Sequence, residues 1–482
     1  MSGISYLKDC LGILPFLILF GMGVVLLIVS AFSKEGGYVK GSHIAISGII
    51  LGFLALFLAP LPQKDLLFNN MVYCDRFSLF LEFLFLLSAL VVVLLSIGAI
   101  AKDGADLAEY YALILFATSG MILISQAAHL IILFLALEIF SISIYILAGL
   151  PKHNPLCVES SLKYFILGAF GSGFLLYGLT FVYGATGSLS LSEISKALST
   201  GRFENTYLII GGILILVGLG FKIALVPFHM WTPDVYEGAP TTITAYMAVG
   251  VKAAAFAAFV RVFWIGLKGI NVEWNTLLWI LAVITMTVGN ICALRQESVK
   301  RMLAYSSIAH AGYIFIGLVV GDRTALGSML YYLLSYAFMN LGAFGVLVLM
   351  RFFDLKENYE DFRGFAYSHP ILGVCMTIFL CSLMGMPPTA GFFAKFMIFS
   401  SAIKAGYVWL VIFAVLNSII AAYYYLRLII YMFTRKDIES YSVSSFPGYS
   451  GLAILISLLG TLGLGILPNY FWEIAKHSIS FI

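Results

Sequence analysis

Long apolar runs, each about the length of a membrane-spanning helix, follow one another along almost the whole chain. A bilayer core about 30 Å thick needs about 20 apolar residues per helix. The pattern therefore predicts an all-α polytopic membrane protein with about 14 transmembrane helices. The expected spans are residues 11–33, 41–61, 74–101, 106–127, 129–150, 158–184, 206–227, 240–266, 275–294, 300–320, 324–351, 368–404, 407–433 and 449–473.

Two of these spans are interrupted. Pro227 stops the seventh span, and the polar run His229–Glu237 follows it. The span 368–404 is too long for one simple crossing and contains Pro387-Pro388. Proline breaks a helix because it lacks an N–H and clashes with the preceding turn. One interrupted span in each half indicates an internal repeat with sites near mid-bilayer, since broken backbone persists there only where it faces protein or water.

Composition supports this class and excludes others. Of the 482 residues, 61% are hydrophobic and 11% are charged, a balance foreign to soluble domains. The net charge of +3 is too small to suggest nucleic-acid binding. The six cysteines show no CxxC spacing, and there is no P-loop, haem motif or GxGxxG after a strand. We therefore predict no metal and no cofactor on this chain, and we expect the first apolar run to be a retained helix.

Ionisable side chains inside or beside the predicted spans are the candidate functional residues. A lysine at the bilayer centre costs about 2.5–3.5 kcal/mol on insertion scales, so each one calls for an explanation. Spread over successive helices, such groups would form a series that binds and releases protons across or along the membrane. The candidates for proton transfer are Glu138, Lys163, Lys222, His229, Lys252, His310 and Lys395.

Most candidates also have a structural alternative. Glu138 could form a static buried pair that only fixes packing. Lys163, near the start of its helix, and Lys222 could extend to a membrane interface. His229 could be a hydrogen-bonded core residue, and the serines near His310 could bond to backbone carbonyls instead of holding a water chain.

Two further charged residues are interpreted as structural. Glu82 lies about one-third of the way into the third span, and we expect it to pair with a neighbouring helix. Arg261 follows Lys252 by two and a half turns, and we expect it to reach the membrane interface. Neither is predicted to carry protons.

Several stretches resemble a known family. FKIALVPFHMW at 221–231, RMLAYSSIAHAGY at 301–313 and GMPPTAGFFAK at 385–395 resemble the antiporter-like subunits of the proton-pumping NADH–quinone oxidoreductase, respiratory complex I. WTPDVYEGAPT, LKYFILGAFGSGFLLYG and Lys252 make the chain most similar to the subunit N family within that group. The resemblance covers about residues 105–435. One departure is APTTITAY, where that family usually has a proline after the threonine.

The resemblance implies an architecture and a set of roles. It implies two inverted five-helix repeats, each containing a broken helix. The corresponding division is a three-helix segment at 1–105, repeats at 106–266 and 275–433, and a C-terminal helix within 434–482. The implied roles are a Glu138–Lys222 pair, Lys163 as a connecting group, Lys252 as the mid-channel relay and Lys395 as the group for proton uptake or release.

The implied function is that of a proton-translocating membrane subunit of NADH–quinone oxidoreductase, driven by quinone reduction elsewhere in the complex. NADH, flavin, iron–sulfur clusters and quinone would then belong to partner subunits. The expected partners are other membrane-arm subunits and the lipid bilayer of the bacterial inner membrane, with both termini outside the cytoplasm from a slight Lys/Arg bias. Two alternatives remain open: a subunit of a multisubunit cation/proton antiporter, and a passive membrane anchor of a related redox complex.

Overall fold

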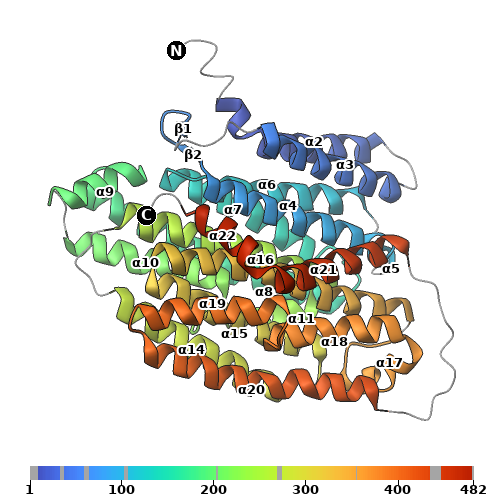
Figure 1. Ribbon diagram of the computed structural model, residues 1–482. Coiled ribbons are helices and arrows are strands. Elements are labelled where there is room, and N and C mark those ends of the chain that lie inside the picture. Colours follow the sequence, from blue (N-terminus) through green and yellow to red (C-terminus); the bar gives the residue numbers. More distant parts are fainter. Residues whose placement is uncertain are drawn as a thin grey trace.

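The long helices run roughly parallel or antiparallel to one another in a bundle (Figure 1). The computed structural model describes residues 9–32, 37–58, 65–102, 107–201, 205–268, 274–353, 355–434 and 447–479. Within these residues, thirteen helical stretches are long and apolar enough to cross a membrane. They are α2 (Leu14–Phe32), α3 (Gly37–Leu58), α4 (Arg76–Ser96), α6 (Ala108–Ser125), α7 (Leu130–Ala148), α8 (Pro155–Thr186), α10 (Asn205–Ile223), the stretch Thr241–Gly266, α14 (Trp274–Leu294), α15 (Val299–Val320), α16 (Arg323–Met350), α20 (Val408–Phe433) and α21 (Gly448–Ile466).

One further crossing is built from two half-helices, α18 (Pro370–Met384) and α19 (Ala390–Lys404). The predicted span 368–404 is therefore interrupted, as its prolines indicated. At the break, the Gly391 N–H donates to Ser382 Oγ at 3.0 Å, and a Cβ at Gly391 would lie 1.8 Å from the Ser382 carbonyl oxygen. Only glycine permits this approach. With this crossing, the prediction of about 14 transmembrane helices is confirmed.

The other predicted break follows α10. Ala224 has a φ of 61°, which ends the helix, and a turn leads into the short helix α11 (Trp231–Gly238). The Val226 N–H donates to Thr285 Oγ1 at 3.1 Å, and Trp231 Nε1 donates to the Phe221 carbonyl at 3.0 Å. Side chains thus occupy backbone groups that the break releases, as broken helices in a membrane require.

The stretch Thr241–Gly266 lies at the centre of the molecule. Residues 241–263 are all buried. Two π-helical segments interrupt its α-helix, so the order is α12 (Thr241–Tyr246), η1 (Met247–Val251), α13 (Lys252–Phe259) and η2 (Val260–Gly266). Inserted π turns are frequent at functional sites. Lys252 is the first residue after the first of them.

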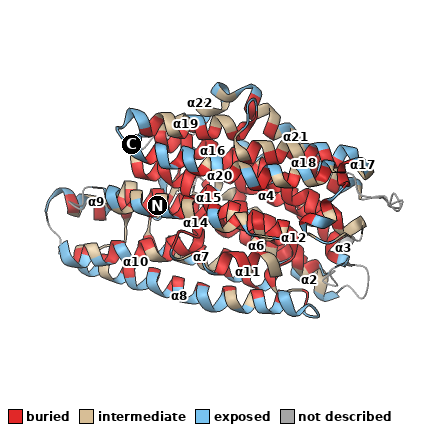
Figure 2. Cartoon of the chain, turned by 90° about the horizontal axis from the view of Figure 1, so that it is seen from below, coloured by how far each residue is buried: buried red, intermediate tan, exposed pale blue. Residues whose placement is uncertain are grey.

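The outer helices turn apolar side chains away from the protein. Figure 2 shows a long exposed side along α8, which carries large apolar residues such as Phe165 and Phe170. The inner side of α8 lies close to α10, where a Cβ at Gly178 would come within 2.8 Å of the Gly211 carbonyl oxygen. Small residues thus set the helix spacing, and the exposed side suits a lipid environment.

Short elements join the long helices or lie at their ends. β1 and β2 form an antiparallel hairpin between α3 and α4. α22 follows the last crossing. Their bounds are β1 (Asp65–Leu67), β2 (Val72–Cys74), α5 (Ala99–Lys102), α9 (Leu191–Ser199), η3 (Arg351–Phe353), η4 (Tyr359–Phe362), α17 (Phe365–Ser368) and α22 (Pro468–His477).

Candidate functional site

Lys222 lies in the last turn of α10, directly before the first break, with 1% of its surface exposed. Its Nζ donates to Ser141 Oγ at 2.8 Å and to the Tyr145 hydroxyl at 2.9 Å, both on α7. The rings of Tyr145 and Tyr164 lie 5.1 and 5.6 Å from the Nζ atom. Aromatic faces attract a cation. Lys222 therefore points into a polar interior and does not reach an interface.

Glu138 lies on the same face of α7, one turn before Ser141 and two turns before Tyr145. Among the described residues it forms no ion pair with Lys222, and its buried Oε1 accepts no hydrogen bond. Among the described residues the implied Glu138–Lys222 pair is thus not formed, and two of the three N–H groups of Lys222 donate to neutral hydroxyls instead. Glu138 is the one acidic residue of α7.

Lys252 projects from α13 toward α15 and is 2% exposed. Its Nζ donates to the Ser307 carbonyl at 2.6 Å and also to the Ser307 hydroxyl. The ring of Tyr236 lies 6.0 Å away. No described carboxylate forms an ion pair with it. A second buried lysine is therefore held by neutral oxygens alone.

His310 lies one turn beyond Ser306 and Ser307 on α15 and is buried. Its Nδ1 lies 2.8 Å from the Tyr332 hydroxyl and its Nε2 lies 3.2 Å from the Tyr425 hydroxyl. The Tyr425 hydroxyl also bonds to Ser306. Hydroxyls and an imidazole can each donate and accept. The polar groups of α15, α16 and α20 thus form one connected network beside Lys252.

Lys395 lies in α19 just after the second break and is 5% exposed. Its Nζ donates to the Met384 carbonyl, at the C-terminus of α18, at 2.9 Å. The negative end of a helix dipole favours a cation at this position. The ring of Tyr313 lies 4.8 Å from the Nζ atom and 5.8 Å from the ring of His310. Tyr313 thus contacts both Lys395 and His310.

Lys163 lies apart from the buried lysines. Its side chain is 42% exposed and pairs with Glu159 at 2.7 Å and with Asp234 at 3.0 Å. Asp234 also pairs with Arg301 at 3.1 Å, and these residues line a surface hollow of about 250 Å³. The prediction left open whether Lys163 would extend outward, and the structure places it at this charged surface.

His229 lies in the turn between α10 and α11 and is 8% exposed. Its Nδ1 is buried and has no hydrogen-bond partner among the described residues. Its carbonyl accepts from the Thr232 N–H at 2.9 Å. The ring is therefore at the break, as predicted, but outside the network that surrounds His310.

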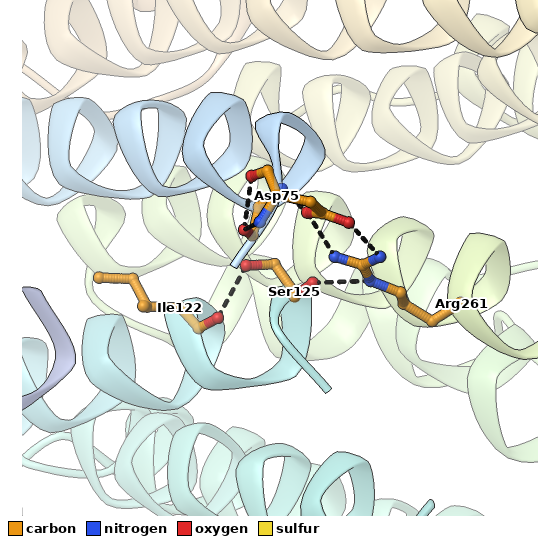
Figure 3. Close-up of polar contacts among 5 residues, drawn as sticks. Asp75, Ile122, Ser125 and Arg261 are labelled. Atoms are coloured by element: carbon orange, nitrogen blue, oxygen red, sulfur yellow. Dashed lines mark hydrogen bonds and ion pairs between the residues drawn. The ribbon is translucent and has the colours of Figure 1, made fainter. Parts of the chain in front are cut away.

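Arg261 was expected at the interface, and the structure buries it completely. Its Nη1 and Nη2 contact Asp75 Oδ2 and Oδ1 at 2.7 and 2.8 Å, and its Nε donates to the Ser125 carbonyl at 2.9 Å (Figure 3). The guanidinium also stacks over Tyr73 at 4.5 Å. These contacts join η2 to the start of α4 and the end of α6. Protein groups thus replace water as the hydrogen-bond partners of the Arg261 guanidinium.

Asp75 is the N-cap of α4 and was not recognised in the sequence. It forms a capping box with Ser78, whose backbone N–H donates to Asp75 Oδ1 at 2.9 Å. Burial alone would raise the pKa of the Asp75 carboxyl, but the Arg261 guanidinium and the bonds from Ser78 hold that pKa below its usual value. An acid directly before an apolar run, with serine three residues later, was the available signal.

A charged cluster in the connection after α16 was also missed. Glu357 accepts from Thr241 Oγ1 at 2.6 Å and faces Arg351 Nε at 3.5 Å and Lys300 Nζ at 3.8 Å. Burial would raise the pKa of the Glu357 carboxyl, but Lys300 and Arg351 hold it below its usual value. Lys300 also donates to the Ala239 carbonyl at 2.7 Å. The cluster fixes the start of α12 against the start of α15.

Comparison with known proteins gives consistent matches. Residues 127–421 match the family described as NADH:quinone oxidoreductase/Mrp antiporter, TM. The NADH-quinone oxidoreductase subunit N of Trichlorobacter lovleyi is 44% identical over 98% of this chain and 97% of its own length. The subunit N 1 of Chloroherpeton thalassium is 38% identical over 98% and 99% of the two chains.

Solved structures match over nearly the whole chain as well. A chain of respiratory complex I from Thermus thermophilus with bound aureothin aligns with a TM-score of 0.80 and 33% identity, covering 96% of this chain and 99% of its own. A chain of the Mrp complex from Dietzia has a TM-score of 0.83 at 19% identity, covering 98% and 97%, which is a likeness of fold alone.

Proposed function

This chain belongs to the NADH-quinone oxidoreductase subunit N family, and on that premise we propose that it translocates protons in the membrane arm of such an enzyme. The observation that carries the proposal is the set of buried lysines, Lys222, Lys252 and Lys395, whose Nζ atoms bond only neutral oxygens among the described residues. A lysine without a fixed counter-ion can lose its proton, because burial disfavours the charged form.

The proposed route in the second half begins at Lys252. Lys252 Nζ donates to the Ser307 hydroxyl, and Ser306, the preceding residue on α15, connects through the Tyr425 hydroxyl to His310. Among the described residues no hydrogen bond joins Ser307 to Ser306, so the passage of the proton between these two hydroxyls requires a side-chain rotation or a water molecule. Among the described residues no hydrogen bond joins His310 to Lys395, which both contact the ring of Tyr313, so this last transfer also requires a side-chain movement or a water molecule. That step is the natural point of control in the route.

Glu138 supplies a second control in the proposal. While Lys222 bonds Ser141 and Tyr145, its charge has no carboxylate partner among the residues that the structure describes. Approach of Glu138 would favour the protonated lysine, and its withdrawal would favour release. The pair implied by the family is then one of two states of the same residues. Lys163 and His229 are assigned supporting roles, at the charged surface hollow and at the break.

The proposed assembly follows from the family. Residues 106–266 and 275–433 would be the two inverted repeats, with 1–105 and 434–482 as additions at either end. Oxidation of NADH and reduction of quinone, with flavin and iron–sulfur clusters, would take place on partner subunits. Other membrane-arm subunits would contact this chain in the bacterial inner membrane, and conformational changes there would drive the transfers.

The test is a lysine substitution in the assembled enzyme. Lys222→Ala is expected to abolish or sharply reduce proton pumping while the complex still assembles, because the break would lose its proton-carrying group. The measurement is proton uptake into vesicles at a matched rate of NADH oxidation. Lys404→Ala, the same change at an exposed position of α19, is the control and is expected to pump normally. Normal pumping by Lys222→Ala would rule out the mechanism.

A further inference from the structure

Glu82 is a buried acid that the lysine series does not use. It lies on α4 two turns after Asp75, and its residue surface is 0% exposed. Helices α3, α6, α12, α16 and α21 all pack against α4. As expected, Glu82 pairs with a neighbouring helix. Gln126, directly after α6, donates from Nε2 to Glu82 Oε1 at 2.8 Å. That partner is a neutral amide.

Two oxygens in this acid–amide pair lack a hydrogen bond. Glu82 Oε2 and Gln126 Oε1 are both buried and without a partner among the described residues. The orientation of the amide is fixed, because Gln126 Nε2 also donates to the Gly12 carbonyl at 3.1 Å. Turning the amide over would leave that carbonyl facing an oxygen. The acid–amide pair thus has two unsatisfied acceptors and no remaining donor.

Within the part of the chain that the structure describes, no cation bonds to Glu82 to compensate an ionised carboxylate. Arg261 is the charged donor of this region, and its terminal nitrogens bond Asp75 while its Nε bonds the Ser125 carbonyl. Asp75 carries a negative charge of its own, which disfavours a second carboxylate on the same face of α4. Among the described residues, Glu82 forms no ion pair.

We propose that Glu82 is a proton-binding site separate from the lysine series, held as a neutral carboxylic acid by Gln126. A proton on Oε2 removes the buried charge and turns an unpaired acceptor into a donor. Gln126 Oε1 is the acceptor on the amide already bound to this acid. A proton on Oε2 that is donated to Gln126 Oε1 would give both oxygens a hydrogen bond, whereas an ionised Glu82 leaves both oxygens without one in an apolar interior.

The test is infrared difference spectroscopy of the purified complex in H₂O and D₂O at neutral pH. A protonated carboxylic acid has a C=O stretch that is separate from carboxylate bands and shifts on deuteration. Glu82→Gln is expected to remove one such band, with assembly preserved because a neutral amide replaces a neutral acid. Glu193→Gln, at an exposed acid on α9, is the matched control and is expected to remove carboxylate bands only.

A second variant keeps the proposal testable if Glu82→Gln fails to assemble. Gln126→Leu leaves the acid in place and removes the amide that donates to its carbonyl oxygen. The acid C=O band is then expected to move to higher frequency. Two results would overturn the assignment. One is that Glu82→Gln removes carboxylate bands instead of an acid band, and the other is that Gln126→Leu leaves the acid C=O region of the spectrum unchanged. Neither result would bear on the lysine route, since Glu82 is not part of it.

Discussion

Two regions of this molecule bury a cation in opposite ways. Arg261 is enclosed by Asp75 and the Ser125 carbonyl, so its charge has a carboxylate partner in fork geometry. Lys252, nine residues earlier in the same stretch, bonds only the carbonyl and hydroxyl of Ser307 within the described part of the chain. Both side chains are almost completely buried. The two regions therefore differ in the charge of the groups that bond the buried cation and not in how deeply the cation is buried.

The chemistry of a buried cation and of its partners decides whether that cation can release a proton. Arginine does not lose its proton in proteins, and a bidentate pair fixes it in one geometry. A lysine has one ammonium on a flexible stem, and its proton affinity follows its surroundings. When all its partners are neutral, the proton affinity of the lysine can still be changed by the approach or withdrawal of a charged group. The Arg261 region is accordingly a joint between helices, and the Lys252 region is suited to moving protons.

Breaking the joint is expected to have the largest effect. Asp75→Asn leaves a buried guanidinium without its counter-charge, which costs about 3–5 kcal/mol. We expect a much lower yield of assembled complex and a lower midpoint in thermal unfolding. Adding Arg261→Met to Asp75→Asn should recover part of the loss, because the unpaired charge is then removed. If Asp75→Asn alone were as stable as the wild type, the assignment of this pair as a joint between helices would be contradicted.

Acid should reveal the same pair without a mutation. The pKa of the Asp75 carboxyl is lower in the folded protein than its unfolded value of about 3.9. The pair therefore contributes its full stability above pH 3.9, and that contribution is lost as the pH falls through the folded value. The loss of stability in this acid range should be smaller in Asp75→Asn than in the wild type. Equal acid sensitivity would argue against the pair.

The lysine region should respond in transport and hardly in stability. Ser307→Ala removes one hydroxyl from Lys252 but leaves the backbone carbonyl in place. A hydrogen bond is worth about 0.5–1.5 kcal/mol, so we expect pumping to slow by up to about tenfold with normal assembly. Ser88→Ala, where the buried serine bonds only a carbonyl of its own helix, is the control. Equal pumping by both variants would remove Ser307 from the route.

The smallest expected effect is at Glu138. Glu138→Gln removes the charge that is proposed to move toward Lys222, but it leaves the hydrogen bonds of Lys222 to Ser141 and Tyr145 intact. We expect turnover to fall a few-fold, with a shift in its pH dependence. The measurement is the rate of NADH oxidation across pH in tightly coupled vesicles. A wild-type rate and pH profile would show that Glu138 does not tune Lys222.

Sequence reasoning identified the membrane class, the number of crossings and both breaks. Lys222, Lys252, His310 and Lys395 stood out because charges are rare in apolar runs, and all four are buried in the structure. The same reasoning placed Arg261 at an interface. Its partner Asp75 is 186 residues away in the chain, and no local pattern connects the two.

The sequence by itself determined which segments enter the membrane, because apolar length and proline act locally. Only the tertiary structure decided which polar groups meet. It placed Ser141 and Tyr145, and not Glu138, against Lys222, gave Asp75 to Arg261, and left Lys163 at a charged surface. Hydrogen bonds and ion pairs act over a few ångströms, so helix packing selects the partner of each buried charge, and that partner decides whether the charge stays fixed or can move a proton.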